Sequence, residues 1–308
     1  MAEKYLMEIT LLPEKLRRLA IPGRLEFANG HGGLPLVKVH TPWSTAEIYL
    51  LGAHVAGFQK NGGPPLLFMS ARSYFAGGKA IRGGVPICLP WFGPRDGEPA
   101  HGFARVASWE MVETAAAPDG AVTIRFRLPE DPARPDWSAL HAEYVVTVAE
   151  TLALELTAAN ASADQTLTLE NCLHTYFQVG DLGAVALAGL EGAPFDDFAA
   201  GAGGARRPGD MAPLAITRET NRVYPDNTAT VEIRDAKFNR VIRVEKFNSR
   251  STVVWNPWTT QKLPEDFDPA EHQHMVCVES GNVKQNQLSL PPGKISTLKV
   301  VLGSSPLK

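Results

Sequence analysis

Short segments of alternating or β-branched residues recur along most of this chain, and turn residues separate them. This pattern predicts β-strands with one buried and one exposed side. The clearest pair, 144–150 and 152–157 (LALELT), has almost no connector and is expected to form an antiparallel hairpin. Further strands are expected at 36–40, 46–58, 106–113, 121–128, 166–173, 174–179, 231–233, 241–247, 252–255, 275–278 and 295–302.

No helical period is sustained, and one short helix is expected at 13–19, where a proline takes an allowed first position. Many short strands separated by turns favour two packed sheets. The sequence therefore predicts an all-β fold, a large antiparallel two-sheet β-sandwich formed by residues 1–308 as a single domain.

The charge balance excludes some classes of partner. Thirty Lys and Arg residues face 33 Asp and Glu, a formal net charge of -3, so no general basic field would attract nucleic acid or an anionic membrane. No run of about eighteen apolar residues occurs, so no membrane-spanning segment is expected. Any anion site must be local.

The three cysteines, Cys88, Cys172 and Cys277, each lie among apolar residues. An odd number without a CxxC spacing favours buried free thiols over a disulfide framework or a zinc site. We therefore expect a cytoplasmic protein without a metal site.

Residues 80–105 combine prolines, paired glycines and basic side chains in a stretch that cannot be a regular helix. Shaped loops of this kind often carry binding residues, because a rigid scaffold holds them in place. The polar side chains here include Arg82, Arg95, His101 and Arg105. The alternative is a structural crossover whose arginines are solvated or paired with surface acids.

Two further polar residues stand in strand-like apolar contexts. His174 lies in ENCLHTYFQVG, where an imidazole either is hydrogen-bonded in a core or faces a pocket. Glu279 follows MVCV at the expected end of a strand, where an unpaired buried carboxylate would be unfavourable, so a partner is expected. That partner could be a basic residue in a structural ion pair, or Glu279 could be a general base held by its neighbours. Together the His, Glu and Arg residues of these loops and strand ends could exchange protons while holding an anion.

Two segments interrupt the strand rhythm. Residues 183–210, rich in Ala and Gly, are interpreted as a tolerated insertion, with a flexible excursion near a site as the alternative. Residues 256–274 are polar and proline-containing, and a short helical turn is expected there.

Seven motifs occur in an order that resembles the hexose-6-phosphate mutarotases, also called glucose-6-phosphate 1-epimerases, of the aldose 1-epimerase superfamily. They are IRGGVP (81–86), PWFGP (90–94), HGFAR (101–105), SWE (108–110), LHTYF (173–177), VVWNPW (253–258) and VCVESGNV (276–283). The resemblance spans about residues 36–302. It implies a galactose mutarotase-like β-supersandwich that is monomeric and needs neither metal nor cofactor.

The resemblance also implies roles for individual residues. His174 of LHTYF would be the general acid and Glu279 of VCVESGN the general base, while His101 of HGFAR would bind the sugar near its ring oxygen. Arg82 and Arg105 would hold the phosphate of a hexose 6-phosphate. The implied reaction interconverts the α and β anomers of glucose 6-phosphate, with galactose and mannose 6-phosphate as further candidates.

One position departs from the family pattern. Relatives often carry Asp in a segment that contacts sugar hydroxyls, whereas this chain reads ETNRVY with Asn221. The Asn221 carbonyl can accept a hydrogen bond but lacks the strengthening charge, which leaves the sugar preference open. Trp255 and Trp258 are candidates for an apolar wall or for the core. Two alternatives remain: an aldose 1-epimerase of unphosphorylated sugars, and a non-catalytic carbohydrate-binding sandwich.

Overall fold

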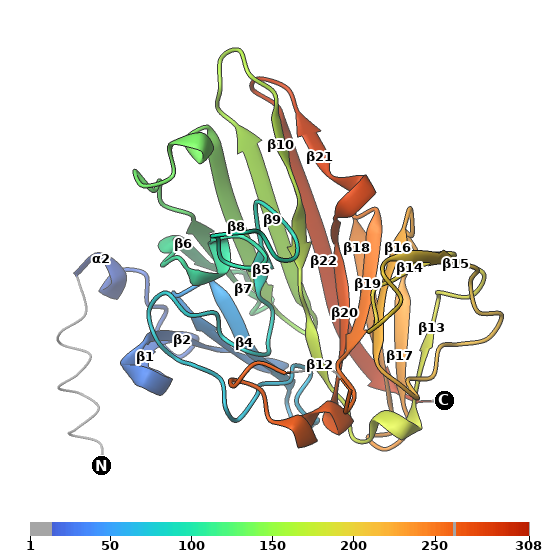
Figure 1. The fold of residues 1–308 in the computed structure, drawn as a ribbon. Helices are drawn as coiled ribbons and strands as arrows, with labels where there is room; N and C mark the ends of the chain where they lie inside the picture. The colour runs from blue at the N-terminus through green and yellow to red at the C-terminus, as the bar shows by residue number, and fades with distance from the viewer. Residues whose placement is uncertain (1–13, 261–262, 308) are drawn as a thin grey trace.

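The computed structural model describes residues 14–260 and 263–307, and its architecture is a pair of large antiparallel sheets with two smaller ones (Figure 1). The first large sheet has the order β13 (Val185–Ala188), β17 (Val231–Asp235), β18 (Arg240–Phe247), β22 (Ile295–Pro306), β9 (Leu152–Asn160), β8 (Leu140–Val148), β7 (Val122–Arg127) and β6 (Glu110–Ala116).

The second large sheet has the order β15 (Ala205–Arg207), β14 (Phe195–Asp197), β16 (Thr220–Pro225), β19 (Ser251–Asn256), β20 (Met275–Asn282), β11 (Asn171–Leu173) and β5 (Ile87–Cys88), and β12 (Tyr176–Gln178) also pairs with β20. The smaller sheets are β1 (Leu25–Asn29), β2 (Pro35–His40), β3 (Ser44–Tyr49) and β4 (His54–Lys60), and the pair β10 (Leu167–Leu169) and β21 (Leu288–Leu290). The predicted all-β sandwich is confirmed.

Helical structure is confined to short turns. The α-helix α2 covers only Glu14–Arg17, so the expected helix at 13–19 is shorter than predicted, and its proline lies outside the described residues. The 3-10 turns are η1 (His31–Gly33), η2 (Ala104–Val106), η3 (Pro135–Trp137), η4 (Leu182–Ala184), η5 (Pro269–His274) and η6 (Lys284–Asn286). No helix within 14–260 or 263–307 has the length and apolarity needed to cross a membrane.

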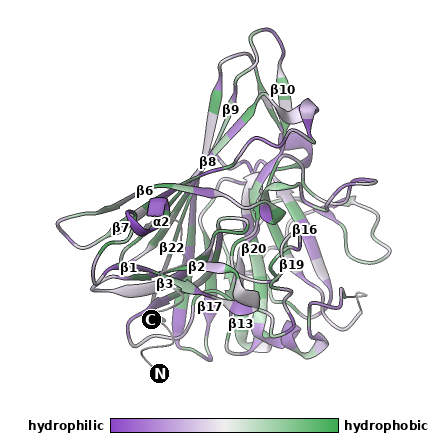
Figure 2. Cartoon of the chain, turned by 90° about the vertical axis from the view of Figure 1, so that its left-hand side faces the viewer, coloured by the Kyte–Doolittle hydropathy of each residue, from purple (hydrophilic) through white to green (hydrophobic). Residues whose placement is uncertain are grey.

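Alternation of burial explains the best-predicted strands. In β8 and β9 alternate residues are buried, and the hairpin expected at 144–157 forms with Val148 opposite Leu152. One core cluster joins apolar side chains of both large sheets, including Leu154 of β9 and Val278 of β20. In Figure 2 much of β20 and β19 is green, which marks these strands as hydrophobic. The core thus fixes the face that each strand presents to a pocket.

Several strand predictions need correction. The expected strand at 106–113 begins only at Glu110, and the expected strand at 166–173 is divided into β10 and β11, which pair with different strands. The expected strand at 46–58 is two strands, β3 and β4, because the chain turns at Gly52 and Ala53, both with positive φ. The expected strand at 275–278 continues to Asn282, and all eight residues of β20 are buried. Glu279 therefore lies inside a strand instead of at its end.

The segment at 183–210 is wrongly interpreted as an insertion. Its strand β13 pairs with β17 in the first large sheet, while β14 pairs with β16 and β15 extends the second. Since the segment completes an edge of both sheets, its Ala and Gly content reflects tight turns between short strands. In 256–274 the expected helical turn is confirmed as η5, which a capping box of Asp268 and Glu271 begins.

The 80–105 loop contains only β5 and η2 as regular structure. Its backbone is pinned to the strands beside it: His174 N donates to Pro86 O at 3.0 Å, and Tyr176 N donates to Gly84 O at 2.9 Å. Gly102 has φ +81°, and a Cβ there would lie 1.9 Å from Leu89 O. The loop therefore requires glycine beside His101.

We expect Gly102→Ala to lower the free energy of unfolding by about 2–5 kcal/mol, combining the strain of a left-handed residue with overpacking against Leu89. Gly97→Ala is the matched control, because Gly97 lies in the same loop with φ +73° but has no atom within 4 Å of an added Cβ. It should lose only about 1–2 kcal/mol. Urea unfolding measures both, and equal losses would contradict the close contact.

Candidate active site

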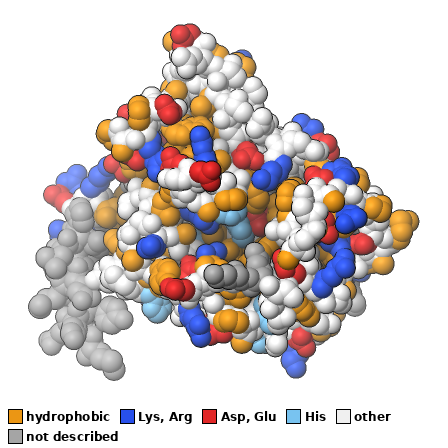
Figure 3. All heavy atoms as spheres, viewed as in Figure 1, with side chains coloured by type: hydrophobic (Ala, Val, Ile, Leu, Met, Phe, Trp, Pro, Cys, Tyr) orange, Lys and Arg blue, Asp and Glu red, His pale blue; other side chains and the backbone are white. Residues whose placement is uncertain are grey.

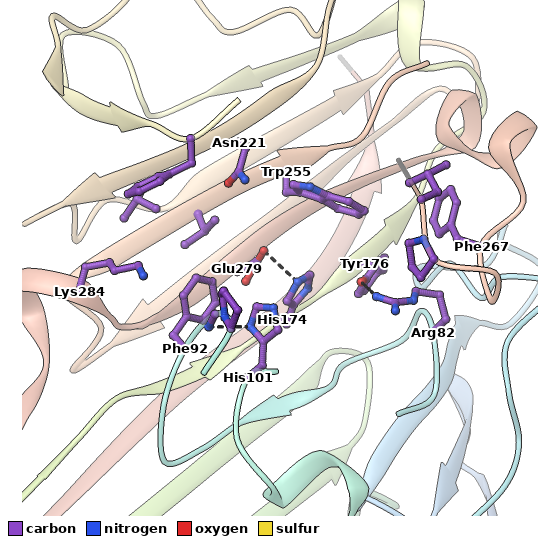
Figure 4. Close-up of a pocket in the computed structure, with 17 residues that line it drawn as sticks. Arg82, Phe92, His101, His174, Tyr176, Asn221, Trp255, Phe267, Glu279 and Lys284 are labelled. Atoms are coloured by element: carbon purple, nitrogen blue, oxygen red, sulfur yellow. Dashed lines mark hydrogen bonds and ion pairs between the residues drawn. The ribbon is translucent and has the colours of Figure 1, made fainter. Parts of the chain in front are cut away.

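A pocket of about 330 Å³ opens on the second large sheet, under the 80–105 loop. Its volume suits a small ligand. Figure 3 shows a pale-blue histidine surface near the centre of this face, and Figure 4 shows the lining side chains pointing toward one another. The lining comprises Arg82, Phe92, Gly93, Pro94, His101, His174, Tyr176, Phe198, Asn221, Val223, Val253, Trp255, Leu263, Pro264, Phe267, Glu279 and Lys284.

Strand register brings His174 and Glu279 together. Leu173 at the end of β11 pairs with Ser280, and Tyr176 at the start of β12 pairs with Cys277. The same register places His174 opposite Glu279 on β20. The His174 amide points away from β20 and donates to Pro86, while the Thr175 amide between β11 and β12 donates to Leu173 O at 3.0 Å. The His174 Nε2 and Glu279 Oε1 atoms lie 3.3 Å apart at the pocket floor.

Burial dominates the protonation of both groups. The pKa of Glu279 is well above its usual range because the carboxyl is removed from solvent, although the Cys172 thiol and the Arg105 charge oppose this shift. Burial also holds the pKa of His174 well below its usual range, and the nearby His101, Arg105 and Arg82 add to the decrease. Each member of the pair therefore favours its neutral form.

The Cys172 thiol is a contact of the carboxylate that the sequence did not reveal. Its Sγ donates to Glu279 Oε2 at 3.7 Å, and both groups are buried. A thiol is a weak donor, so it orients the carboxylate without strongly stabilising the charge. Cys172 and Cys88 lie opposite each other on β11 and β5, and all three cysteines are free and buried as predicted.

His101 stands between the loop and His174. Its Nδ1 accepts from Gly93 N at 3.3 Å, and its ring meets that of His174 edge-on at 5.4 Å between centroids. Burial lowers the pKa of His101 to about 3, with further decreases from Arg105, Arg82 and Lys284. A neutral ring that accepts at Nδ1 carries its proton on Nε2. His101 can therefore donate one hydrogen bond from Nε2.

The two predicted phosphate-binding arginines differ in their surroundings. Arg82 lines the pocket, but its guanidinium already donates to both Asp266 oxygens, at 3.2 and 3.3 Å, and to the Tyr176 hydroxyl at 3.2 Å. Arg105 is not among the lining residues. Its Nε is buried and has no hydrogen-bond partner among the described residues, and burial lowers its pKa.

Asn221 and Trp255 form one wall. They are opposite each other on β16 and β19, and both line the pocket. The Trp255 ring meets the Tyr176 ring edge-on at 6.0 Å between centroids, so it is positioned against the pocket. Trp258 does not line the pocket. It packs against the main core and meets the ring of His272, which favours the core alternative for this residue.

Sequence reasoning missed several lining residues. Lys284 begins η6 with φ +57°, and its ammonium lies 5.7 Å from the Phe198 ring centroid. Phe198 follows β14 in the segment interpreted as an insertion, so its place at the pocket could not be foreseen. Lys284 follows VCVESGNV directly, and that proximity to a motif was the available signal. The Glu170 carboxylate joins this turn to the loop by accepting from the Lys284 and Phe92 amides.

One group in this site has ligand types that suit a metal ion. Ligand atoms of His174, Cys277 and Glu279 all lie within 4.8 Å of one another, and all three residues are buried. Cys277 and Glu279 are two positions apart on β20 and therefore share a face.

Comparisons with known proteins identify the family of this chain. The family model for aldose 1-epimerase matches residues 35–303. A relative from Salmonella typhimurium, provisionally named glucose-6-phosphate 1-epimerase, is 33% identical over 254 residues, covering 80% of this chain and 83% of its own.

Solved structures give the same result. The crystal structure of YeaD from Salmonella typhimurium, provisionally called a mutarotase, superposes with a TM-score of 0.83 at 28% identity over 98% of this chain and 99% of that one. A galactose mutarotase-like protein from Clostridium acetobutylicum shares the fold, with a TM-score of 0.67 at 13% identity over 92% and 98% of the two chains. The predicted supersandwich is thereby confirmed, and the chain belongs to the aldose 1-epimerase family.

Proposed function

We propose that this protein is a hexose-6-phosphate mutarotase that interconverts the α and β anomers of glucose 6-phosphate. The observation that carries the proposal is the His174–Glu279 pair, 3.3 Å apart at the floor of a pocket in an aldose 1-epimerase fold. The relative provisionally named glucose-6-phosphate 1-epimerase supports the choice of substrate. The proposal includes a single mutarotase-like domain that acts as a cytoplasmic monomer without a cofactor.

Ring opening requires only proton transfer. Glu279 accepts the proton of the C1 hydroxyl while His174 donates a proton to the ring oxygen O5, and the C1–O5 bond breaks to give the open-chain aldehyde. Rotation about C1–C2 presents the other carbonyl face. The reverse transfers then close the ring with C1 inverted, and the proton count of the pair is restored.

The buried environment favours the open-chain stage of this cycle. Ring opening converts a charged pair, Glu279 carboxylate and His174 imidazolium, into a neutral pair. Burial shifts both pKa values toward that neutral pair. Hydrogen bonds from the bound sugar would stabilise the charged form before opening. His101, with a proton available on Nε2, is placed to bind near the ring oxygen.

Positive charge supports an anionic substrate. Arg82 and Lys284 line the pocket, and Arg105, which is not among the lining residues, has a buried Nε without a hydrogen-bond partner among the described residues. Guanidinium groups bind phosphate oxygens through forked, charge-assisted hydrogen bonds. In this proposal Arg82 and Arg105 hold the phosphate, and Arg105 gains the anionic partner that no described residue supplies. Asn221 and Trp255 contact the sugar itself.

An aldose 1-epimerase of free sugars is the second candidate, favoured by the engagement of Arg82 with Asp266. Anomer exchange measured by NMR on glucose 6-phosphate and on free glucose distinguishes the two. Faster exchange of the phosphorylated sugar supports the first proposal, whereas a preference for glucose would favour the second.

Glu279→Gln and His174→Ala should each slow anomer exchange by about 10²- to 10⁴-fold, because each removes one proton-transfer group. The double variant should be little slower than either single one, since the two groups act as a unit. His272→Ala is the control: His272 is also buried but lies outside the pocket lining. Wild-type exchange by folded Glu279→Gln would refute the assigned base.

The same glutamate should destabilise the fold at neutral pH. Because its pKa is raised on folding, the folded state binds the proton more tightly, so stability falls as pH rises above about 4.5, the ordinary value of the carboxyl. Glu279→Gln should therefore gain stability over the wild type by up to about 1.4 kcal/mol per pH unit in that window.

Urea unfolding of both proteins at several pH values between 5 and 8 measures this gain. Glu150→Gln is the control, since that side chain is 66% exposed. A stability difference between Glu279→Gln and wild type that stays constant with pH would contradict the buried, desolvated carboxyl.

The phosphate assignment predicts a change in selectivity. Removing one arginine should lower kcat/KM for glucose 6-phosphate by about ten- to a hundredfold, at about 1.5–3 kcal/mol for each charged hydrogen bond. Arg82→Ala and Arg105→Ala should leave exchange of free glucose nearly unchanged. Arg95→Ala is the control, because Arg95 lies in the same loop over the Trp91 ring and outside the pocket lining.

A bracing role for the arginines has a different signature. If Arg82 only supports the loop through Asp266, its loss would slow anomer exchange of both sugars equally and lower the melting temperature of the protein. That combination would refute the phosphate role.

A further inference from the structure

A thiol stands beside the proposed catalytic pair and has no part in its proton transfer. Cys277 precedes Glu279 by two positions on β20, so both side chains lie on the face that His174 meets. The ligand atoms of these three residues are all within 4.8 Å of one another, and each residue is buried. Cys277 is free of any disulfide.

The distances approach those of a tetrahedral metal site. Zinc binds nitrogen and oxygen at about 2.0–2.2 Å, so two such ligands stand about 3.3 Å apart in a tetrahedron. His174 Nε2 and Glu279 Oε1 already have a 3.3 Å separation. A thiolate bound at about 2.3 Å completes three of four positions if the Cys277 sulfur moves inward from its present place, which lies within 4.8 Å of both.

We propose that Cys277, His174 and Glu279 form a binding site for a thiophilic divalent cation such as Zn²⁺, and that occupation of this site inhibits the enzyme. The sulfur, nitrogen and oxygen ligand set selects zinc or cadmium over magnesium, which prefers oxygen ligands. The fourth position faces the pocket that His174 and Glu279 line, so the cation enters by the route of the substrate.

Charge and protons balance in this site. A Cys277 thiolate and a Glu279 carboxylate together offset the two positive charges of the cation. Binding releases the thiol proton and the proton held by the carboxyl, so affinity should increase with pH. The bound cation occupies the His174 lone pair and the Glu279 oxygen, which removes both groups from proton transfer. Inhibition rests on the proposed function, whereas binding of the cation does not.

The first test measures anomer exchange with added Zn²⁺. Micromolar Zn²⁺ should inhibit the wild type, Mg²⁺ at the same concentration should not, and a chelator should restore the rate. Cys277→Ala should keep its exchange activity and require at least tenfold more Zn²⁺ for half inhibition. Cys88→Ala is the matched control, because Cys88 is equally buried but is not part of the His174, Cys277 and Glu279 group and should remain sensitive.

The second test measures cation binding directly and does not depend on enzyme activity. Titration with Co²⁺ should give a near-ultraviolet thiolate-to-cobalt absorption that saturates at one ion per chain in the wild type and in Cys88→Ala. Cys277→Ala, or Cys277→Ser if the alanine variant does not fold, should lack this band. A protein that binds Co²⁺ in this way but does not exchange anomers would refute the proposed function and leave the site standing.

Three results would overturn the site. The first is equal Zn²⁺ sensitivity of wild type and Cys277→Ala. The second is a Cys172→Ala variant that loses its Zn²⁺ sensitivity while Cys277→Ala keeps wild-type Zn²⁺ sensitivity. That result would make Cys172, whose thiol contacts Glu279 Oε2, the sulfur ligand. The third is absence of the cobalt band in the wild type.

Discussion

The site depends on keeping a carboxyl group inside a β-sheet. Glu279 occupies the interior of a strand in which every residue is buried, and only 1% of its surface is exposed. Desolvation there disfavours the charged form, so the carboxyl needs hydrogen-bonding partners. His174, between β11 and β12, lies 3.3 Å from one carboxyl oxygen, and the Cys172 thiol donates to the other. The same burial that destabilises the carboxylate makes it a strong proton acceptor.

The sheet positions this pair through register. Residues on either side of His174 pair with β20, Leu173 with Ser280 and Tyr176 with Cys277. The His174 and Tyr176 amides point the other way and donate to Pro86 and Gly84 of the 80–105 loop, which continues the pairing of β11 with β5. The loop therefore supports the backbone that carries His174, and it also carries His101, whose ring meets the His174 ring edge-on.

Much of the fold could be predicted because the alternation of apolar and polar residues along a strand shows which of its faces is buried. The β8–β9 hairpin, where Val148 pairs with Leu152, is the clearest case. Prediction failed where the strands are too short to show an alternation of apolar and polar residues. The strands within 183–210 have only three or four residues each, so the segment was not recognised as part of the sheets and Phe198 was missed. The roles proposed for His174 and Glu279 came from their motifs. Their contact could not be read from the sequence, because it depends on a register between residues 105 positions apart.

The two arginines proposed to bind the phosphate differ in their surroundings. Arg82 is held by Asp266 and Tyr176, so its fork is oriented before any ligand arrives, and a ligand would gain little new charge from it. Arg105 has the opposite balance, because burial lowers its pKa and its Nε has no described partner. A buried guanidinium without an anion is unfavourable in the free protein, and that cost is relieved when an anion binds. In the proposed phosphate site Arg82, which lines the pocket, would already be oriented before binding, and Arg105 would gain an anionic partner that no described residue supplies.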